Sequence, residues 1–176
     1  MPTTKHEETR RAIKSRLAQT RSEFHILLDS FSDGDLEKRS NNEGWTNGEI
    51  LFHMMFAFIL ILTLVPMMRF WSRLPNPYSK KFADILNFFI MPFNWINGLA
   101  PRAGGKIFAR SRLGIWFDKF YASIIRLVDS VKENEWESGM YYPDKWDPLF
   151  DEYMTLEKLF YYPIRHFEFH VGQLAR

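Results

Sequence analysis

The sequence contains no cysteine. This absence excludes thiolate metal ligands, cysteine nucleophiles and disulfide bonds, so any metal site must use nitrogen and oxygen ligands. It is also compatible with a reducing compartment. The first stretch, Met1 to Arg21, is charged and lacks the apolar region of a signal peptide. We therefore expect a cytoplasmic protein, with a peripheral position at a membrane as the alternative.

Several functional motifs are absent as well. The sequence has no serine nucleophile elbow, phosphate-binding loop or dinucleotide-binding fingerprint. It has no recognised nucleic-acid-binding motif, so nucleic acid is not an expected partner. The 176 residues are 46% hydrophobic and 25% charged, which is a globular composition, and we expect one domain over residues 1–176. The high aromatic content of 17% requires a thick core, an apolar pocket or a bilayer to receive these side chains.

Four stretches carry apolar residues at helical spacing, and none shows the alternation that is typical of strands. A capping box at Thr4 predicts a first helix that starts near Lys5 and ends before Ser32. A second capping box, residues 46–49, starts the second helix, and the third covers residues 113–131. The fourth runs from about Thr155 to Ala175. This pattern predicts an all-α four-helix bundle.

The second helix is unusual because residues 54–68 contain no charge. A helix that is apolar on every side lies either deep in a core or in lipid. Residues 50–68 approach the roughly 20 residues that span a bilayer, but Pro66 interrupts the run and His53 would be costly in lipid. We therefore favour a helix that is buried or touches a membrane without crossing it.

Residues 71–106 are expected to form an insertion between the second and third helices, punctuated by prolines and closed by Gly104 and Gly105. A short apolar helix is predicted within it over residues 82–91. The surrounding segment carries eight basic residues and one acidic residue, Asp84, interleaved with Phe and Trp. Such a surface suits anionic lipid, an anionic ligand or a dimer interface. The eight basic residues are Arg69, Arg73, Lys80, Lys81, Arg102, Lys106, Arg110 and Arg112.

Three histidines form the candidate functional site. His166 and His170 lie four residues apart on the stripe of the fourth helix that should face the core. His53 lies on the second helix and can supply a third ligand. Three imidazoles leave a fourth position open for water or substrate on a tetrahedral ion. The ligand set suits several metals; Zn²⁺ is our first expectation and Ni²⁺ the second.

Three further side chains are predicted to serve this site. Glu49 lies one turn before His53 and can be a hydrogen-bond acceptor, an extra ligand or a general base, or simply a cap of the helix. Gln173, one turn after His170, can orient that ligand. Tyr162, one turn before His166, can point its hydroxyl at the open position or pack in the core.

These residues carry a resemblance to a known family. The sequence around Trp45, Glu49 and His53, followed by His166-x-x-x-His170 and then Gly172-Gln173, resembles the DinB-like metalloprotein superfamily. The resemblance implies a four-helix bundle whose metal is held by one histidine of the second helix and two of the fourth. It covers the whole chain in order. The long insertion, and Val171 where many members have a basic residue, depart from the pattern.

Characterised DinB-like proteins include thiol S-transferases and thiol-dependent isomerases, and many are homodimers. The resemblance therefore implies a metal-dependent transferase, isomerase or hydrolase that acts on a hydrophobic small molecule, with a low-molecular-weight thiol as a cosubstrate. The alternative is a non-catalytic metal- or lipid-binding helical module. The sequence alone leaves both interpretations open.

Overall fold

The computed structural model describes residues 5–42, 44–107 and 110–175. The helices are α1 (Lys5–Ser30), α2 (Asp33–Glu37), α3 (Asn47–Trp71), α4 (Asn76–Phe88), α5 (Ile90–Ile107), α6 (Arg110–Asp129) and α7 (Leu156–Val171). A 3-10 turn, Glu133–Glu135, and two strands, β1 (Gly139–Tyr141) and β2 (Tyr153–Thr155), lie between α6 and α7. The fold is all-α, as predicted.

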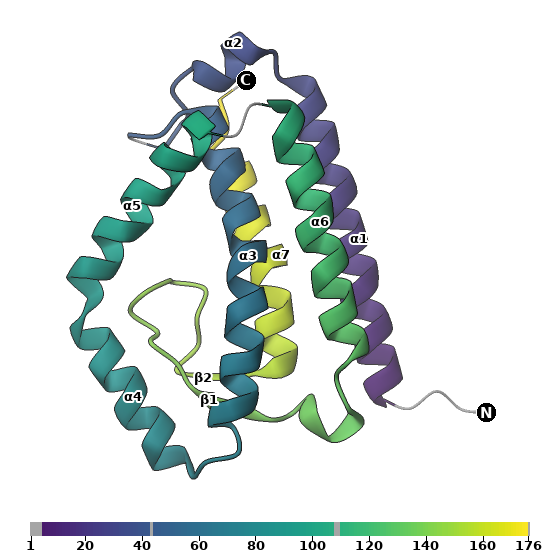
Figure 1. Cartoon of the computed structure of the whole chain (residues 1–176), viewed down its shortest axis with the longest axis vertical. Coiled ribbons are helices and arrows are strands. Elements are labelled where there is room, and N and C mark those ends of the chain that lie inside the picture. Colours follow the sequence, from purple (N-terminus) through teal and green to yellow (C-terminus); the bar gives the residue numbers. More distant parts are fainter. Residues whose placement is uncertain (1–4, 43, 108–109, 176) are drawn as a thin grey trace.

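Helices α1, α3, α6 and α7 stand side by side and form the bundle (Figure 1). Helix α3 packs against α6 and α7, and α1 packs against the same two helices from the other side of the bundle. Aromatic rings fill the space between them; Phe24 and Phe117, for example, stack with centroids 4.0 Å apart. The bundle core therefore gathers the four apolar stripes of the sequence.

Helix α3 is the central helix of the bundle. It is long and apolar enough to cross a membrane by length and composition, but 56% of its most apolar stretch is buried inside the structure. Its start is fixed by the predicted capping box: the Thr46 N–H donates to Glu49 Oε2 at 2.9 Å, and the Glu49 N–H donates to Thr46 Oγ1 at 3.3 Å. The first predicted capping box lies at Thr4, outside the described residues.

Helices α4 and α5 form an arm beside the bundle (Figure 1). Helix α4 leaves near the end of α3 and α5 returns near its start, and the two helices meet at a vertex that points away from the bundle. The predicted helix over residues 82–91 is wrong in its bounds, because α4 runs from Asn76 to Phe88. Pro77 lies in the first turn of α4, where a backbone N–H has no partner within the helix, so proline is well tolerated there. Gly104 lies inside α5, which continues to Ile107.

Three further expectations require correction. The sequence showed no strand alternation, yet β1 and β2 pair antiparallel with Met140 opposite Met154. Each strand has three residues, which is too short for a visible alternation. Residues 33–37, where the sequence predicted no helix, form the single turn α2, capped by Ser32. Finally, α7 ends at Val171, four residues before the predicted end.

Candidate metal centre

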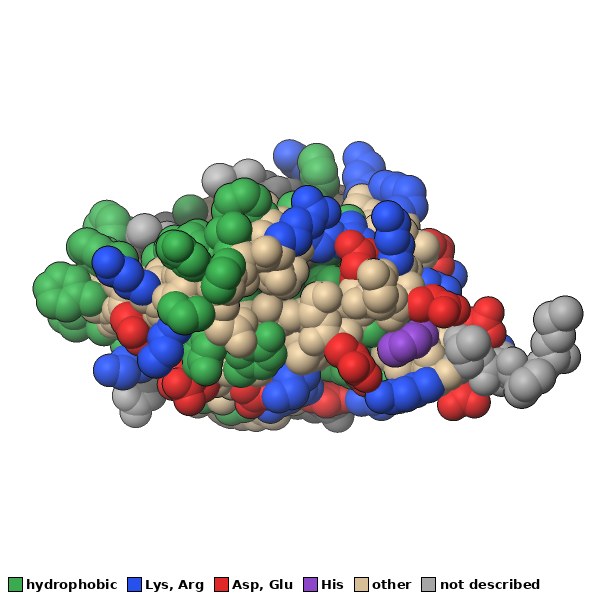
Figure 2. Space-filling model, turned by 90° about the horizontal axis from the view of Figure 1, so that it is seen from below, with side chains coloured by type: hydrophobic (Ala, Val, Ile, Leu, Met, Phe, Trp, Pro, Cys, Tyr) green, Lys and Arg blue, Asp and Glu red, His purple; other side chains and the backbone are tan. Residues whose placement is uncertain are grey.

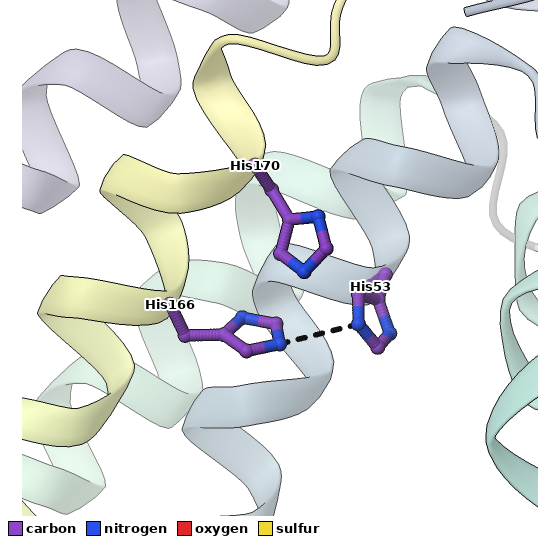
Figure 3. A group of neighbouring side chains, drawn as sticks. All are labelled: His53, His166 and His170. Carbon is purple, nitrogen blue, oxygen red and sulfur yellow. Dashed lines mark hydrogen bonds between the residues drawn. The ribbon is translucent and has the colours of Figure 1, made fainter. Parts of the chain in front are cut away.

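The fold brings the three predicted histidines together (Figure 3). His53 projects from α3, and His166 and His170 project from consecutive turns of α7. All three are buried, with 3–7% of each side chain exposed. Their candidate ligand nitrogens lie within 4.8 Å of one another. The described residues that can jointly hold a metal ion are therefore the three that the sequence predicted.

The closest approach is between His53 Nε2 and His166 Nε2, which lie 3.2 Å apart. Two nitrogens bound tetrahedrally at 2.0–2.1 Å from one ion lie about 3.3 Å apart. The two rings are therefore spaced as ligands of a shared ion. Within the described part of the chain, Nδ1 of each of these two rings is buried and has no hydrogen-bond partner, whereas the two Nε2 atoms face each other.

All three imidazoles are held in the neutral state. Burial lowers the pKa of His53 to about 3, with a smaller contribution from His170. Burial also lowers the pKa of His166 well below its ordinary value, and that of His170 to a lesser extent. Three neutral imidazoles near pH 7 present lone pairs and no positive charge, which is the state that a metal ligand requires.

Gln173 is hydrogen-bonded to the third histidine. Nδ1 of His170 donates to Gln173 Oε1 at 2.6 Å, and the same oxygen accepts a hydrogen bond from Asn42 Nδ2 at 3.1 Å. A proton held on Nδ1 leaves the lone pair on Nε2, the nitrogen that faces the other rings. Gln173 therefore lies where the prediction of an orienting residue requires; any catalytic role of this side chain remains a prediction.

Asn47 holds the C-terminal segment that carries Gln173. The Asn47 side chain is fully buried. It accepts a hydrogen bond from the Ala175 N–H at 3.0 Å and donates to the Ala175 carbonyl oxygen at 2.9 Å. It also donates to the Asp35 carbonyl oxygen at 3.0 Å. This side chain joins the start of α3 to the end of the chain, so the helix that bears His53 positions the acceptor of His170.

Glu49 occupies the cap of α3. Its Oε2 accepts the Thr46 N–H in the capping box. His53 Nδ1, one turn later, has no hydrogen-bond partner among the described residues. The structure therefore does not place Glu49 as the hydrogen-bond acceptor of His53, because the carboxylate is engaged with the backbone. A role as a ligand or general base remains a prediction.

Tyr162 reaches a neighbour that the sequence did not reveal. Its hydroxyl donates to Asp147 Oδ2 at 2.8 Å, and its ring centroid lies 5.5 Å from that of His166. Burial, reinforced by Asp147, raises the Tyr162 pKa well above its usual value, so the phenol stays protonated. The Asp147 charge also raises the pKa of His170, against the larger effect of burial. The hydroxyl is therefore held by a carboxylate beside the histidines.

Aromatic rings wall the histidines. The Trp45 centroid lies 4.7 Å from that of His53 and 6.4 Å from that of His170. Phe150 packs on Tyr162 with centroids 4.6 Å apart. A separate cavity of about 600 Å³ lies between α4 and the loop after β1; its lining includes Lys80, Tyr142 and Glu152 but none of the three histidines.

Comparison with known proteins agrees with the geometry. The sequence profile of the DinB superfamily matches residues 16–174, which is almost the whole chain. The searches of curated proteins and of solved structures found no match to this chain. The matched range contains all three histidines, and the bundle with one histidine on α3 and two on α7 is the arrangement that the resemblance implied. The chain belongs to the DinB superfamily.

Proposed function

We propose that His53, His166 and His170 bind one divalent metal ion, Zn²⁺ as the first expectation and Ni²⁺ as the second, and that the protein is a metal-dependent enzyme. The observation that carries the proposal is the convergence of three buried, neutral imidazoles with two Nε2 atoms 3.2 Å apart. An all-nitrogen donor set suits these ions and disfavours Mg²⁺ and Ca²⁺, which prefer oxygen.

A divalent metal held by His53, His166 and His170 would supply a Lewis acid that lowers the pKa of a bound water or thiol. The chain contributes the surroundings. Gln173 holds His170 in the required tautomer. The Trp45 ring packs against His53 and the Tyr162 ring against His166, and all three histidines are buried. Exclusion of bulk water strengthens electrostatic interactions inside such a site.

Tyr162 and Asp147 form the polar part of this wall. Because its pKa is raised, Tyr162 acts as a hydrogen-bond donor and not as a base near pH 7. Asp147 accepts from Tyr162 and from the Leu149 N–H at 2.8 Å, so its carboxylate is held in place. We propose that this carboxylate receives the proton that the cosubstrate releases, directly or through one water.

The proposed reaction is thiol-dependent transfer or isomerisation, or hydrolysis, on a hydrophobic small molecule. The family resemblance and the aromatic wall support this class. A thiol would have to come from a cosubstrate, because the chain has no cysteine. The runner-up is a non-catalytic metal-binding module, in which the same three histidines only stabilise the bundle.

The experiment uses purified protein in three states: as isolated, stripped by a chelator, and stripped then reloaded with Zn²⁺ or Ni²⁺. Each state is offered a low-molecular-weight thiol with an apolar electrophile, and separately an apolar ester. We expect turnover that disappears with the metal and returns on reloading. His6→Ala, a histidine remote from the centre, is the matched control for His166→Ala. Activity that survives complete metal removal contradicts the proposal, and stoichiometric metal without turnover favours the runner-up.

A further inference from the structure

The arm exposes an apolar tip where α4 and α5 meet. Phe88 is 81% exposed, Met91 76% and Trp95 69%. Phe89, between the two helices, is also exposed. We call these four residues the arm tip. Seen from below, hydrophobic side chains gather at the end of the molecule that carries these two helices (Figure 2). A contiguous apolar surface of this kind usually marks an interaction site.

The exposed face continues along both helices. On α4, Tyr78 and Ile85 are exposed on the same side as Phe88, while the buried side carries the small residues Ser79 and Ala83. On α5, Leu99 extends the exposed series with a spacing of four residues from Trp95. The arm thus buries the small residues Ser79 and Ala83 and exposes several large apolar side chains, whereas Phe82 stacks on Trp71 of α3. An ordinary bundle helix instead turns its large apolar residues towards the core.

The charge of the arm is strongly one-sided. Helices α4 and α5 contain four basic residues and one acidic residue, Asp84. Asp84 and, from outside the arm, Glu152 lie 3.4 and 3.8 Å from Lys80. The four basic residues and Asp84 leave the two helices with a formal charge of +3. Arg73 precedes the arm, and it is exposed, as are Lys81 and Arg102 within it. An exposed apolar ridge with basic flanks is complementary to an anionic lipid surface.

The shape favours a bilayer over a second copy of the chain. The arm tip lies at the vertex of α4 and α5, which points away from the bundle (Figure 1). A symmetric dimer through this face would bring the same basic segments of two copies together, which costs free energy. A convex ridge of Phe, Met and Trp can instead enter the boundary between headgroups and acyl chains, with Lys81 and Arg102 left at the headgroups.

We propose that the α4–α5 arm docks the protein peripherally on anionic membranes, with the arm tip inserted and α3 remaining in the bundle core. The proposal needs no metal at the histidines, because the arm tip contains none of them. It assigns a role to the insertion that separates this chain from the short-looped pattern of the family.

The test is flotation of the full-length protein with vesicles of phosphatidylcholine alone and with 30% phosphatidylglycerol (about one third anionic lipid, to give a strong surface potential). At low salt we expect binding to the anionic vesicles, at least about tenfold weaker binding without the anionic lipid, and release in high salt. Phe88→Ser with Met91→Ser should lower the binding at least about tenfold. Lys81→Gln should lower it about fivefold.

The matched control is Ile26→Ser, which removes an apolar side chain that is 65% exposed on α1, away from the arm. It should leave binding unchanged. Circular dichroism shows whether the variants fold, and the exposed positions predict that they do. Absence of binding to anionic vesicles at low salt overturns the proposal. A wild-type dimer that the Phe88→Ser, Met91→Ser variant separates, without vesicle binding by either protein, overturns it in favour of a second copy.

Discussion

Helix α3 and the α4–α5 arm contain similar apolar side chains, and they use them in opposite ways. Phe58 of α3 is fully buried and packs on Phe117 with centroids 4.5 Å apart. Phe88 of the arm is 81% exposed. The apolar residues of α3 stabilise the bundle and hold His53 in position, whereas those of the arm tip contribute little to folding. Composition alone does not separate these roles; burial does.

The largest expected effect is the difference in unfolding free energy between two matched truncations, one in α3 and one in the arm. Phe58→Ala removes a fully buried ring and should lower the free energy of unfolding by about 3–5 kcal/mol. Phe88→Ala should change it by less than about 0.5 kcal/mol. Urea denaturation of both variants measures the difference. Equal losses would show that the arm tip is packed in solution and would remove the basis of the comparison.

Acidification should destabilise the bundle through the histidines. The pKa of His53 is about 3 in the folded protein and about 6.5 in the unfolded chain. As the pH falls below 6.5, the unfolded chain binds the proton first, so stability declines progressively towards pH 3. The loss at pH 3 should reach a few kcal/mol in metal-free protein. Unfolding measured from pH 7 to pH 4 for wild type and His53→Gln tests this, and the variant should show the shallower slope.

The acceptor of His170 should control metal affinity without being a ligand. Gln173→Leu removes the oxygen that receives the Nδ1 proton, and the affinity should fall about 10- to 100-fold. Gln173→Glu keeps an acceptor and should retain most of the affinity. Competition with a chromophoric chelator gives the dissociation constants. If the Leu variant binds metal as tightly as the wild type, the hydrogen bond has no orienting role.

The smallest expected effects come from two glycines of α5, Gly104 near its end and Gly98 in its middle. A Cβ at Gly104 would overlap the Phe52 ring of α3, so Gly104→Ala should cost about 1–3 kcal/mol. Nothing lies within 4 Å of a Cβ at Gly98, so Gly98→Ala should raise helix stability by up to about 1 kcal/mol. Thermal unfolding of the two variants should shift in opposite directions. Shifts of the same sign would contradict the close packing of α5 on α3.

The bundle and the three histidines could be predicted because they depend on local patterns. Capping residues such as Thr46 and Glu49 mark a helix start through contacts three residues apart. Residues four apart on a core-facing stripe, such as His166 and His170, must point the same way. His53 was a candidate third ligand on the second helix, and the family resemblance supported that choice. The packing of α3 on α7 brings it to the same point.

The remaining features depend on contacts between distant segments. Asp147 lies in a loop without helical spacing and becomes recognisable only when Tyr162 donates to it. Asn47 appeared only as a capping-box residue, yet its amide ties α3 to the C-terminal segment. In the arm, prolines were interpreted as breaks, although Pro77 starts α4. Such positions carry no local signal of their tertiary partner.

The most direct test of the central claim is the metal content of the purified protein, measured by elemental analysis beside the protein concentration. The account predicts one equivalent of Zn²⁺ or Ni²⁺ per chain in the wild type and in His6→Ala. It predicts a near-complete loss in His170→Ala with the helical content unchanged. A wild-type protein that binds no divalent metal after reloading, or a His170→Ala variant that retains a full equivalent, would contradict it.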